Sequence, residues 1–266
     1  MVVGLQSFQN HVMIQEKRCK MYHFFVDSSA ITKENIQITG QDVNHIMNVL
    51  RLKAGEPLII SDGEGLEYRC VIEALTNEAI QCKIQSVDES ISELPIQVTL
   101  YQGAPKQDKM EQVTQKCVEL GVHEIVSVQM RRSIVKYEPS KALKKVQRWN
   151  GIAESAAKQS KRGMIPKVRG VLKWRELLTE LEDYDKVIIP YENTRGMMGT
   201  KEVFQQLHHA KKIAVIIGPE GGFDPEEIEQ LLSYDGELIS LGNRILRTET
   251  AGMVFMAMLM YEIEEA

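Results

Sequence analysis

The stretch IAVIIGPEGGFDPEE, residues 213–227, has the pattern of a buried strand that passes through a glycine loop into a helix. Its first five residues are all apolar, which is typical of a strand in a parallel sheet covered on both faces. Three glycines follow, and then Asp224 and Pro225 form a helix start, with Asp as the N-cap and Pro in the first turn. This succession predicts an α/β fold in which a strand-end loop lies beside a helix N-terminus.

The glycine loop carries carboxylates, which limits the kind of ligand that it could accept. Its glycines allow a ligand to approach the main chain. Glu220 and Asp224, however, would lie close to any phosphate and would repel it. No lysine follows the glycines, so the pattern of a nucleotide triphosphate loop is absent. A ligand with adenine, ribose and a cationic centre but no phosphate fits better, and S-adenosylmethionine is such a molecule.

A second loop, in ISLGNRILRTETAGMVF at residues 239–255, also joins a strand to a helix start through a glycine turn. Arg244 and Arg247 are the only basic residues after Lys212. An isolated arginine near a strand end is a candidate contact for a phosphate or a base, and a structural ion pair is the alternative. Ligands of parallel sheets bind beyond the carboxyl ends of the strands. We therefore expect the two loops to share one ligand.

Two regions of the chain differ in pattern. Residues 96–266 alternate apolar strands with amphipathic helices, which predicts a parallel α/β sheet. Residues 21–93 consist of short β-type runs separated by turn signals such as Asp62-Gly63, which predicts a small β-barrel-like domain. Residues 1–20 fit neither pattern and are interpreted as a leader of uncertain status.

The composition is typical of a globular protein, with 43% hydrophobic and 26% charged residues. No apolar run approaches the roughly 20 residues of a membrane helix, so no membrane contact is expected. The four cysteines are scattered without CxxC spacing, and the six histidines lack metal-ligand spacing. We therefore expect no metal site and a cytoplasmic location.

Charge is unevenly distributed along a chain whose net charge is −5. Residues 131–162 contain ten Lys and Arg against two Glu, whereas residues 213–266 contain two Arg against eleven acidic residues. A solvated helix face usually mixes both signs of charge. The basic segment therefore predicts contact with a polyanion, and nucleic acid is the expected partner.

Several motifs resemble those of one enzyme family. GPEGG at 218–222 and LGNRILRTETA at 241–251 are similar to the two cofactor-loop motifs of SPOUT methyltransferases. GAPKQDKMEQVTQKCVELGV at 103–122 brings the match to the bacterial 16S ribosomal RNA uridine-N3 methyltransferase family. The resemblance implies S-adenosylmethionine-dependent methylation of N3 of a specific uridine in 16S ribosomal RNA of the small subunit. It also implies a PUA-like RNA-binding domain over 21–93, a SPOUT-type parallel sheet with a trefoil knot over 96–266, and a homodimer.

The resemblance and the two loops together give a set of candidate site residues. Glu220 and Glu249 are candidate bases for the imide proton of uracil, and Arg247 is a candidate for stabilising the uracil anion or a phosphate. Turn solvation is the alternative role for Glu220, and helix capping is the alternative for Glu249. The candidate cofactor-binding residues are Ile217, Gly218, Pro219, Glu220, Gly221, Gly222, Leu241, Gly242, Asn243, Ile245, Leu246, Arg247, Thr250 and Ala251. The candidate RNA-binding residues are Arg51, Lys53, Lys106, Arg131, Arg132, Lys144, Lys145, Arg148, Lys158, Lys161 and Arg162.

Two other functions stay open at this point. SPOUT ribose 2′-O-methyltransferases carry an Asn-x-Gly-x-x-x-Arg stretch after an early strand, where this chain has GAPKQDK at 103–109. A non-catalytic ribosome assembly factor would use the basic segment alone and would bind RNA without a cofactor. His23 stands where the uridine-N3 family usually has arginine, which removes one basic contact from the first strand.

Overall fold

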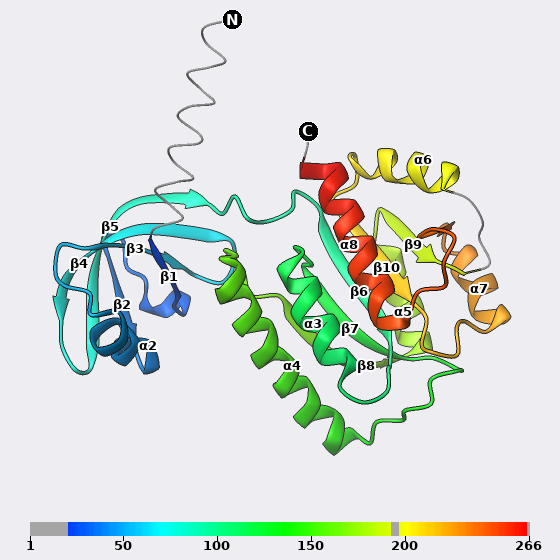
Figure 1. Ribbon diagram of the computed structural model, residues 1–266, viewed down its shortest axis with the longest axis horizontal. Helices are drawn as coiled ribbons and strands as arrows, with labels where there is room; N and C mark the ends of the chain where they lie inside the picture. The colour runs from blue at the N-terminus through cyan, green and yellow to red at the C-terminus, as the bar shows by residue number, and fades with distance from the viewer. Residues whose placement is uncertain (1–20, 193–196, 265–266) are drawn as a thin grey trace, which may run out of the picture. The chain divides into compact units, whose positions relative to one another are not determined.

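The computed structural model describes residues 21–192 and 197–264, and the chain forms two compact units, Met1–Ile91 and Ser92–Ala266 (Figure 1). The leader predicted over residues 1–20 lies outside the described residues. No helix within the described ranges is both long enough and apolar enough to span a membrane.

The N-terminal unit contains one mixed sheet of five strands. They are β1 (Tyr22–Phe25), β2 (Asn35–Thr39), β3 (Pro57–Ser61), β4 (Leu66–Leu75) and β5 (Ala79–Glu89). The strand order is β1-β3-β4-β5-β2, with β1 parallel to β3 and the other pairs antiparallel. The predicted turn between β3 and β4 is confirmed, because Asp62 Oδ1 accepts hydrogen bonds from the amides of Glu64 and Leu66 at 2.8 and 3.1 Å. Two register shifts between β4 and β5 add local twist, which helps the sheet to curl.

The segment between β2 and β3 is helical but is not a regular α-helix. A short 3-10 turn, η1 (Ser28–Ala30), precedes β2, and α2 (Gln41–Asn44) follows it. α2 passes directly into a π-helical segment, η2 (His45–Leu50), which ends at Arg51 in the left-handed conformation with φ of 57°. Single π-turns of this kind are frequent at functional sites. The core that the sheet and η2 enclose contains Ile36, Ile38, Ile46, Leu58, Ile60, Cys70, Ile72, Ile80 and Cys82, all nearly inaccessible.

The C-terminal unit is an α/β domain built on six parallel strands, as the sequence predicts. The strands are β6 (Gln97–Gly103), β7 (Glu124–Gln129), β8 (Lys167–Lys173), β9 (Lys186–Pro190), β10 (Lys212–Ile217) and β11 (Gly236–Ile239), in the order β11-β9-β10-β6-β7-β8. Every pairing in this sheet is parallel. The helices are α3 (Lys109–Glu119), α4 (Pro139–Ser160), α5 (Trp174–Glu180) with the 3-10 turn η3 (Leu181–Asp183), α6 (Met198–Leu207), α7 (Pro225–Leu232) and α8 (Thr248–Glu264).

Helices cover both faces of this sheet (Figure 1). On β6, Leu100 faces α3 and α8, while its neighbour Tyr101 packs with Leu177 of α5 and Leu231 of α7. This alternation follows from the two-residue period of a strand. Since both faces are covered, β6 and β10 are buried over most of their length, and in β10 this burial is matched by a continuous apolar run, Ile213–Ile217.

The strand order brings the two motif loops to the same edge of the sheet, with β9 between the strands that they follow. β6 and β10 are central neighbours, and their register pairs Gln102 with Ile217 at the carboxyl ends. β9 and β11 lie on the other side of β10 and end at the same edge of the sheet. The loops that follow β6, β9, β10 and β11 therefore converge at one edge, where ligands of open parallel sheets bind.

The described cysteines are apolar core residues. Cys70, Cys82 and Cys117 are buried, and this burial raises the pKa of each thiol to about 12. Within the part of the chain that the structure describes, His, Cys, Asp and Glu form no cluster that could hold a metal ion.

Candidate active site

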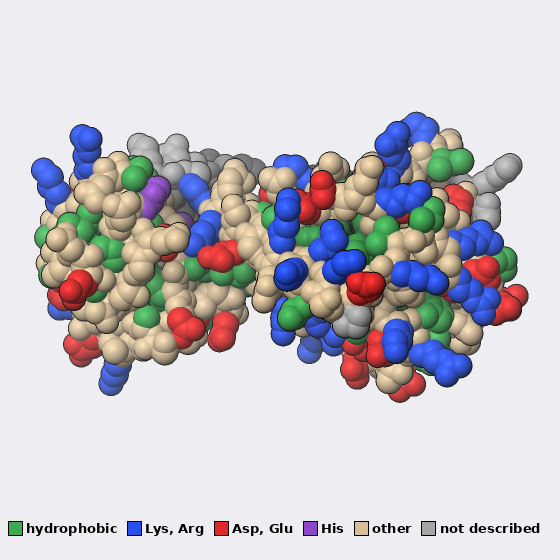
Figure 2. Space-filling view, turned by 90° about the horizontal axis from the view of Figure 1, so that it is seen from below, with side chains coloured by type: hydrophobic (Ala, Val, Ile, Leu, Met, Phe, Trp, Pro, Cys, Tyr) green, Lys and Arg blue, Asp and Glu red, His purple; other side chains and the backbone are tan. Residues whose placement is uncertain are grey.

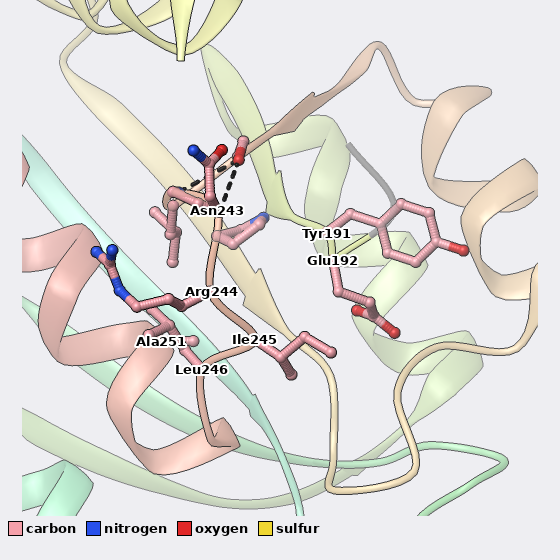
Figure 3. Close-up of a pocket in the computed structure, with 11 residues that line it drawn as sticks. Tyr191, Glu192, Asn243, Arg244, Ile245, Leu246 and Ala251 are labelled. Atoms are coloured by element: carbon pink, nitrogen blue, oxygen red, sulfur yellow. Dashed lines mark hydrogen bonds between the residues drawn. The ribbon is translucent and has the colours of Figure 1, made fainter. Parts of the chain in front are cut away.

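Two adjoining cavities lie where the strand-end loops converge. The larger has a volume of about 460 Å³, and the smaller, shown in Figure 3, has a volume of about 110 Å³. The larger is lined by Lys109, Pro190, Glu192, Ile217, Gly218, Pro219, Glu220, Gly222, Phe223, Ile245, Leu246, Arg247, Thr248 and Ala251. The smaller is lined by Pro190, Tyr191, Glu192, Ser240, Leu241, Gly242, Asn243, Arg244, Ile245, Leu246 and Ala251. The five residues common to both sets show that the cavities are continuous parts of one site.

Most of the candidate cofactor-binding residues line this site, and two do not. Gly221 packs against the basic segment, because a Cβ there would lie 2.9 Å from Arg132 Cβ and 3.0 Å from its carbonyl oxygen. Thr250 lies in the first turn of α8, where its amide donates to the Arg247 carbonyl at 2.9 Å. These two residues therefore support the loops and do not line either cavity.

A buried hydrogen-bond chain holds the two loops together. The Gln102 amide nitrogen donates to Thr248 Oγ1 at 2.7 Å, and Thr248 Oγ1 donates to the Gly218 carbonyl at 2.6 Å. Gln102 is fully buried at the end of β6. Because the chain links β6, the glycine loop after β10 and the first residue of α8, a displacement of one of them would disturb the other two.

A cluster of charged side chains lies at the larger cavity. The Lys109 ammonium is 3.0 Å from Glu220 Oε1 and 3.3 Å from Glu249 Oε2. Glu220 Oε1 also accepts the amide of Lys106 at 3.0 Å. Burial works to raise the pKa of Glu220, but the hydrogen bonds from Lys106 and Lys109 outweigh it and lower the pKa below its usual value. Arg247 is 82% exposed, and its Nη1 is 4.0 Å from Glu249 Oε1.

The arginine pair that precedes α4 contacts the start of α7. Asp224 caps this helix by accepting the Glu226 amide at 3.2 Å, as the sequence predicts. Arg131 Nη1 binds Asp224 Oδ1 at 3.2 Å, and the Arg131 amide donates to Glu227 Oε1 at 2.8 Å. Arg132 also reaches Asp224, with Nη2 to Oδ2 at 3.6 Å. The basic segment is therefore attached to the element that follows the glycine loop.

The structure corrects one RNA-binding candidate. Arg162 is 2% exposed, and its guanidinium binds the Glu93 carboxylate and the carbonyl oxygens of Val118 and Val122. A side chain that is buried and fully paired cannot reach a phosphate on the surface, so the assignment of Arg162 to RNA binding is wrong. The reason is the left-handed conformation of Lys161, with φ of 58°, which ends α4 there.

The other RNA-binding candidates keep a position at the surface. Arg51, Lys53, Lys144 and Lys161 are exposed, and Lys106 and Lys158 are half-buried. Arg148 is 66% exposed and forms a paired contact with Glu111, with Nε to Oε1 and Nη2 to Oε2 both at 2.8 Å. Lys145 lies over the ring of Tyr137, 5.8 Å from its centroid. Figure 2 shows many Lys and Arg side chains on one face of the C-terminal unit, with Asp and Glu side chains interspersed among them and along its margin.

Several residues of the site are missing from the sequence-based candidates, among them Lys109, Tyr191 and Glu192. Lys109 begins α3, and Tyr191 and Glu192 follow β9. Figure 3 shows Arg244, Ile245 and Leu246 on one loop, across from Tyr191 and Glu192. The rule that ligands bind beyond strand ends could have pointed to Glu192. Lys109 lies at an ordinary helix start, and no local signal marks it as a site residue.

Fold and site together define a class, the α/β RNA methyltransferases with an N-terminal PUA domain. Residues 92–260 match the family model described as an RNA methyltransferase domain, and residues 38–85 match the RNA methyltransferase PUA domain. The chain belongs to the RNA methyltransferase family that these models define. It is 35% identical to Ribosomal RNA small subunit methyltransferase E of Bacillus subtilis, over 92% of this chain and 98% of that protein.

Two solved structures are similar over nearly the whole chain. One is a Ribosomal RNA small subunit methyltransferase E from Neisseria gonorrhoeae bound to S-adenosyl methionine, with 30% identity, a TM-score of 0.76 and coverage of 91% of this chain and 97% of that chain. The other is a putative methyltransferase from Legionella pneumophila in complex with S-adenosylmethionine, with 29% identity, a TM-score of 0.73 and coverage of 91% and 98%. These relatives confirm the family resemblance and the predicted fold class, a SPOUT-type parallel α/β domain preceded by a PUA-like domain. The trefoil knot stays a prediction.

Proposed function

We propose that this chain transfers a methyl group from S-adenosylmethionine to N3 of a specific uridine in 16S ribosomal RNA of the small ribosomal subunit. The observation that carries the proposal is the convergence of the two motif loops on one cavity, in a chain of the RNA methyltransferase family. A relative with 30% identity is described as bound to S-adenosyl methionine. Because ribosomal RNA is the proposed substrate, we expect the protein in the cytoplasm.

The site has the chemistry that this cofactor requires. A volume of about 460 Å³ lies within the range of roughly 300–1,000 Å³ for small-molecule pockets. The Glu192 and Glu220 carboxylates line it and are compatible with a cationic sulfonium. The N-terminal amides of α7, which could hold a phosphate, are capped by Asp224. Ile245, 88% exposed beside the cavity, offers an apolar surface to an adenine or ribose ring. The residues therefore fit a phosphate-free, positively charged adenosine compound.

The residues of the chain would prepare the nucleobase for methylation. When bound, S-adenosylmethionine supplies the methyl group. The N3 lone pair of uracil becomes available once its imide proton is transferred, and the carboxylate of Glu220 or Glu249 can accept that proton. Negative charge then spreads over the uracil ring, where Arg247, which is largely exposed, can stabilise it. Positioning the base against the cofactor supplies much of the remaining acceleration.

Methyl transfer to RNA tests the function directly. Labelled S-adenosylmethionine would be incubated with 16S ribosomal RNA and, separately, with 30S particles, and the product would be digested to nucleosides. We expect 3-methyluridine at one position. A methyl group on ribose would support the 2′-O-methyltransferase instead. RNA binding without transfer, and without cofactor binding at sub-millimolar concentration, would support the assembly factor.

We further propose that lysines of α4 and its C-terminus, exposed or half-buried, bind the phosphates of the RNA. Replacing Lys144, Lys145, Lys158 and Lys161 with glutamine should weaken RNA binding and flatten its dependence on salt. Each lost phosphate contact should change the slope of log K against log salt by about 0.7–0.9. Lys211→Gln, just before β10 and so at the opposite edge of the sheet from the loops, is the control. An unchanged slope in the fourfold variant would move the RNA-binding face elsewhere.

We also propose that the protein is a homodimer formed through α6 and α8. α8 carries apolar side chains on all sides, which is typical of a helix that is covered all round. Yet an apolar groove of about 420 Å³, lined by Phe204, Val254, Ala257, Met258 and Tyr261 among others, remains open along it, and Tyr261 is 65% exposed. Tyr261→Lys should therefore shift sedimentation from dimer to monomer. A wild-type protein that sediments as a monomer at all concentrations would contradict the proposal.

A further inference from the structure

Lys109 occupies a position in the site that its own helix does not explain. It is the first residue of α3, and its ammonium contacts two carboxylates from different loops, Glu220 after β10 and Glu249 in the first turn of α8. All three side chains are largely covered, with exposed fractions of 22%, 21% and 12%. Lys109 also lines the larger cavity together with Glu220. One cation from a third element therefore joins the two candidate bases.

Helix stability does not account for a lysine at this position. The N-terminus of a helix carries partial positive charge, so a cation there is unfavourable by about 0.3–1 kcal/mol. Asp108, the N-cap, makes no capping hydrogen bond through its side chain. Ion pairs with partial exposure contribute only about 0–1 kcal/mol to stability. The position of Lys109 is instead explained by its effect on the ionisation of the Glu220 and Glu249 carboxylates.

The two carboxylates differ in how they meet Lys109. Glu249 Oε2 is fully buried and, among the described residues, has no partner in hydrogen-bond geometry, although the Lys109 ammonium lies 3.3 Å away. Glu220 Oε1, in contrast, accepts two hydrogen bonds, from the Lys106 amide and from Lys109. Lys109 therefore contacts both carboxylates, and the hydrogen bond to Glu220 is the better formed of the two contacts.

We propose that Lys109 is a positioning residue that keeps the Glu220 and Glu249 carboxylates ionised and next to each other, beside the cavity that Glu220 lines, so that one of them can accept the imide proton of uracil. This inference rests on the proposed function. The proton moves from N3 to a carboxylate oxygen, and the N3 lone pair then forms the bond to the transferred methyl group. Lys109 itself stays an ammonium throughout.

The electrostatics of the cluster support this role. The hydrogen bond to Glu220 raises the pKa of Lys109, burial opposes this, and Glu249 adds to the increase. Lysine is therefore a poor base here. The same contacts lower the pKa of Glu220 against the effect of burial. The other charged or titratable groups that face the carboxylates are Arg247, Glu192 on the cavity wall, and Tyr137, whose pKa is raised by burial and by the charge of Glu220.

Removing the ammonium would leave two acids facing each other. Since both oxygens contact one nitrogen, they can lie no more than about 6 Å apart, and like charges at that range push one carboxyl pKa upward. The carboxylate that becomes protonated can no longer accept a proton from uracil. Activity should then be lost on the acidic side of neutrality and return as the pH rises.

The test compares the full-length wild-type protein with Lys109→Met, Lys109→Arg and the control Lys116→Met, a lysine of the same helix that pairs with Glu119. For Lys109→Met we expect kcat for methyl transfer at pH 7 to fall by about 10–100-fold. In a plot of kcat against pH, the rise of activity on the acidic side should shift to higher pH by at least about one unit. This shift corresponds to a tenfold loss of activity at a fixed pH in that range. Lys109→Arg should restore most of the wild-type pH dependence of kcat, and Lys116→Met should leave that dependence unchanged.

A second readout does not depend on activity. Calorimetry of S-adenosylmethionine binding near pH 6, in buffers with different ionisation enthalpies, gives the number of protons exchanged. We expect Lys109→Met to release more protons than the wild type, because the cationic ligand would ionise a carboxyl that Lys109 normally keeps ionised. At high pH the affinity of Lys109→Met for the cofactor should stay within about threefold of wild type. Lys109 and the ligand are both cations, so the substitution removes no attraction between them.

Three results would overturn the inference. A Lys109→Met variant with the wild-type pH profile would show that the carboxylates need no cation. A loss that is equal at every pH would indicate a merely structural role, as would an identical proton count in calorimetry. If the wild-type protein itself transfers no methyl group to RNA, the proposed function fails, whereas the proton count still tests whether Lys109 controls the carboxylates.

Discussion

Gly103→Ala is expected to reduce affinity for S-adenosylmethionine by more than tenfold and to destabilise the C-terminal unit by about 1–3 kcal/mol. Gly103 ends β6 and is buried beneath the glycine loop. A Cβ at this position would lie 2.6 Å from the backbone nitrogen of Pro219, 2.8 Å from its Cδ and 3.0 Å from the Gly218 carbonyl carbon. Because two of these atoms belong to the main chain, a side-chain rotation cannot relieve the overlap. The loop that lines the cavity must move.

Gly151→Ala is the matched control for this change. Gly151 lies within α4, and a Cβ there meets nothing within 4 Å. Alanine in place of glycine inside a helix should stabilise by about 0.5–1 kcal/mol. Calorimetric titration gives the cofactor affinity, and urea denaturation gives the free energy of unfolding. A Gly103→Ala protein with wild-type cofactor affinity would show that the glycine loop does not form the binding site.

The glycine loop and the fold around it could be predicted because several local signals agree. The apolar run before Gly218 specifies a buried strand, and Asp224 with Pro225 specifies a helix start that the structure confirms. The alternation of strands and helices then indicates a parallel sheet, and ligand sites of such sheets lie at the carboxyl ends of the strands. Hence the sequence alone predicts that both motif loops belong to one site.

The charged cluster could not be predicted in the same way. Lys109 and Glu220 are 111 residues apart in sequence and meet only because β6 and β10 are neighbours in the sheet. Strand order is a property of the whole fold, and no short pattern encodes it. The sequence likewise does not show that Arg148 and Arg162 have different environments. Both belong to the same basic segment, and only the backbone turn at Lys161 decides that one is exposed and the other buried.

Arg162→Met is expected to destabilise the C-terminal unit by about 3–5 kcal/mol, because it breaks a buried ion pair and leaves one charge without its partner. The Glu93 carboxylate, 18% exposed, would lose the guanidinium that binds both of its oxygens. The carbonyl oxygens of Val118 and Val122, which accept from Arg162 Nη1 at 3.1 and 2.6 Å, would lose their donor as well. Urea denaturation, followed by the fluorescence of the two tryptophans, measures the loss. The double variant Arg162→Met and Glu93→Leu removes both partners of the ion pair. It should recover part of the stability, since no buried charge then remains unpaired.

Comparing Arg148→Met with Arg162→Met distinguishes an arginine that binds RNA from an arginine that stabilises the fold. Arg148 is exposed, and its pair with Glu111 should contribute no more than about 1 kcal/mol to stability. Its loss should instead change the salt dependence of RNA binding by about 0.7–0.9 in slope, as expected for one phosphate contact. Arg162→Met, measured at a temperature where the variant is folded, should leave that slope unchanged. The opposite pattern, a stable Arg162→Met protein with a reduced slope, would return Arg162 to the RNA-binding face and would mean that its contacts with Glu93 break in solution.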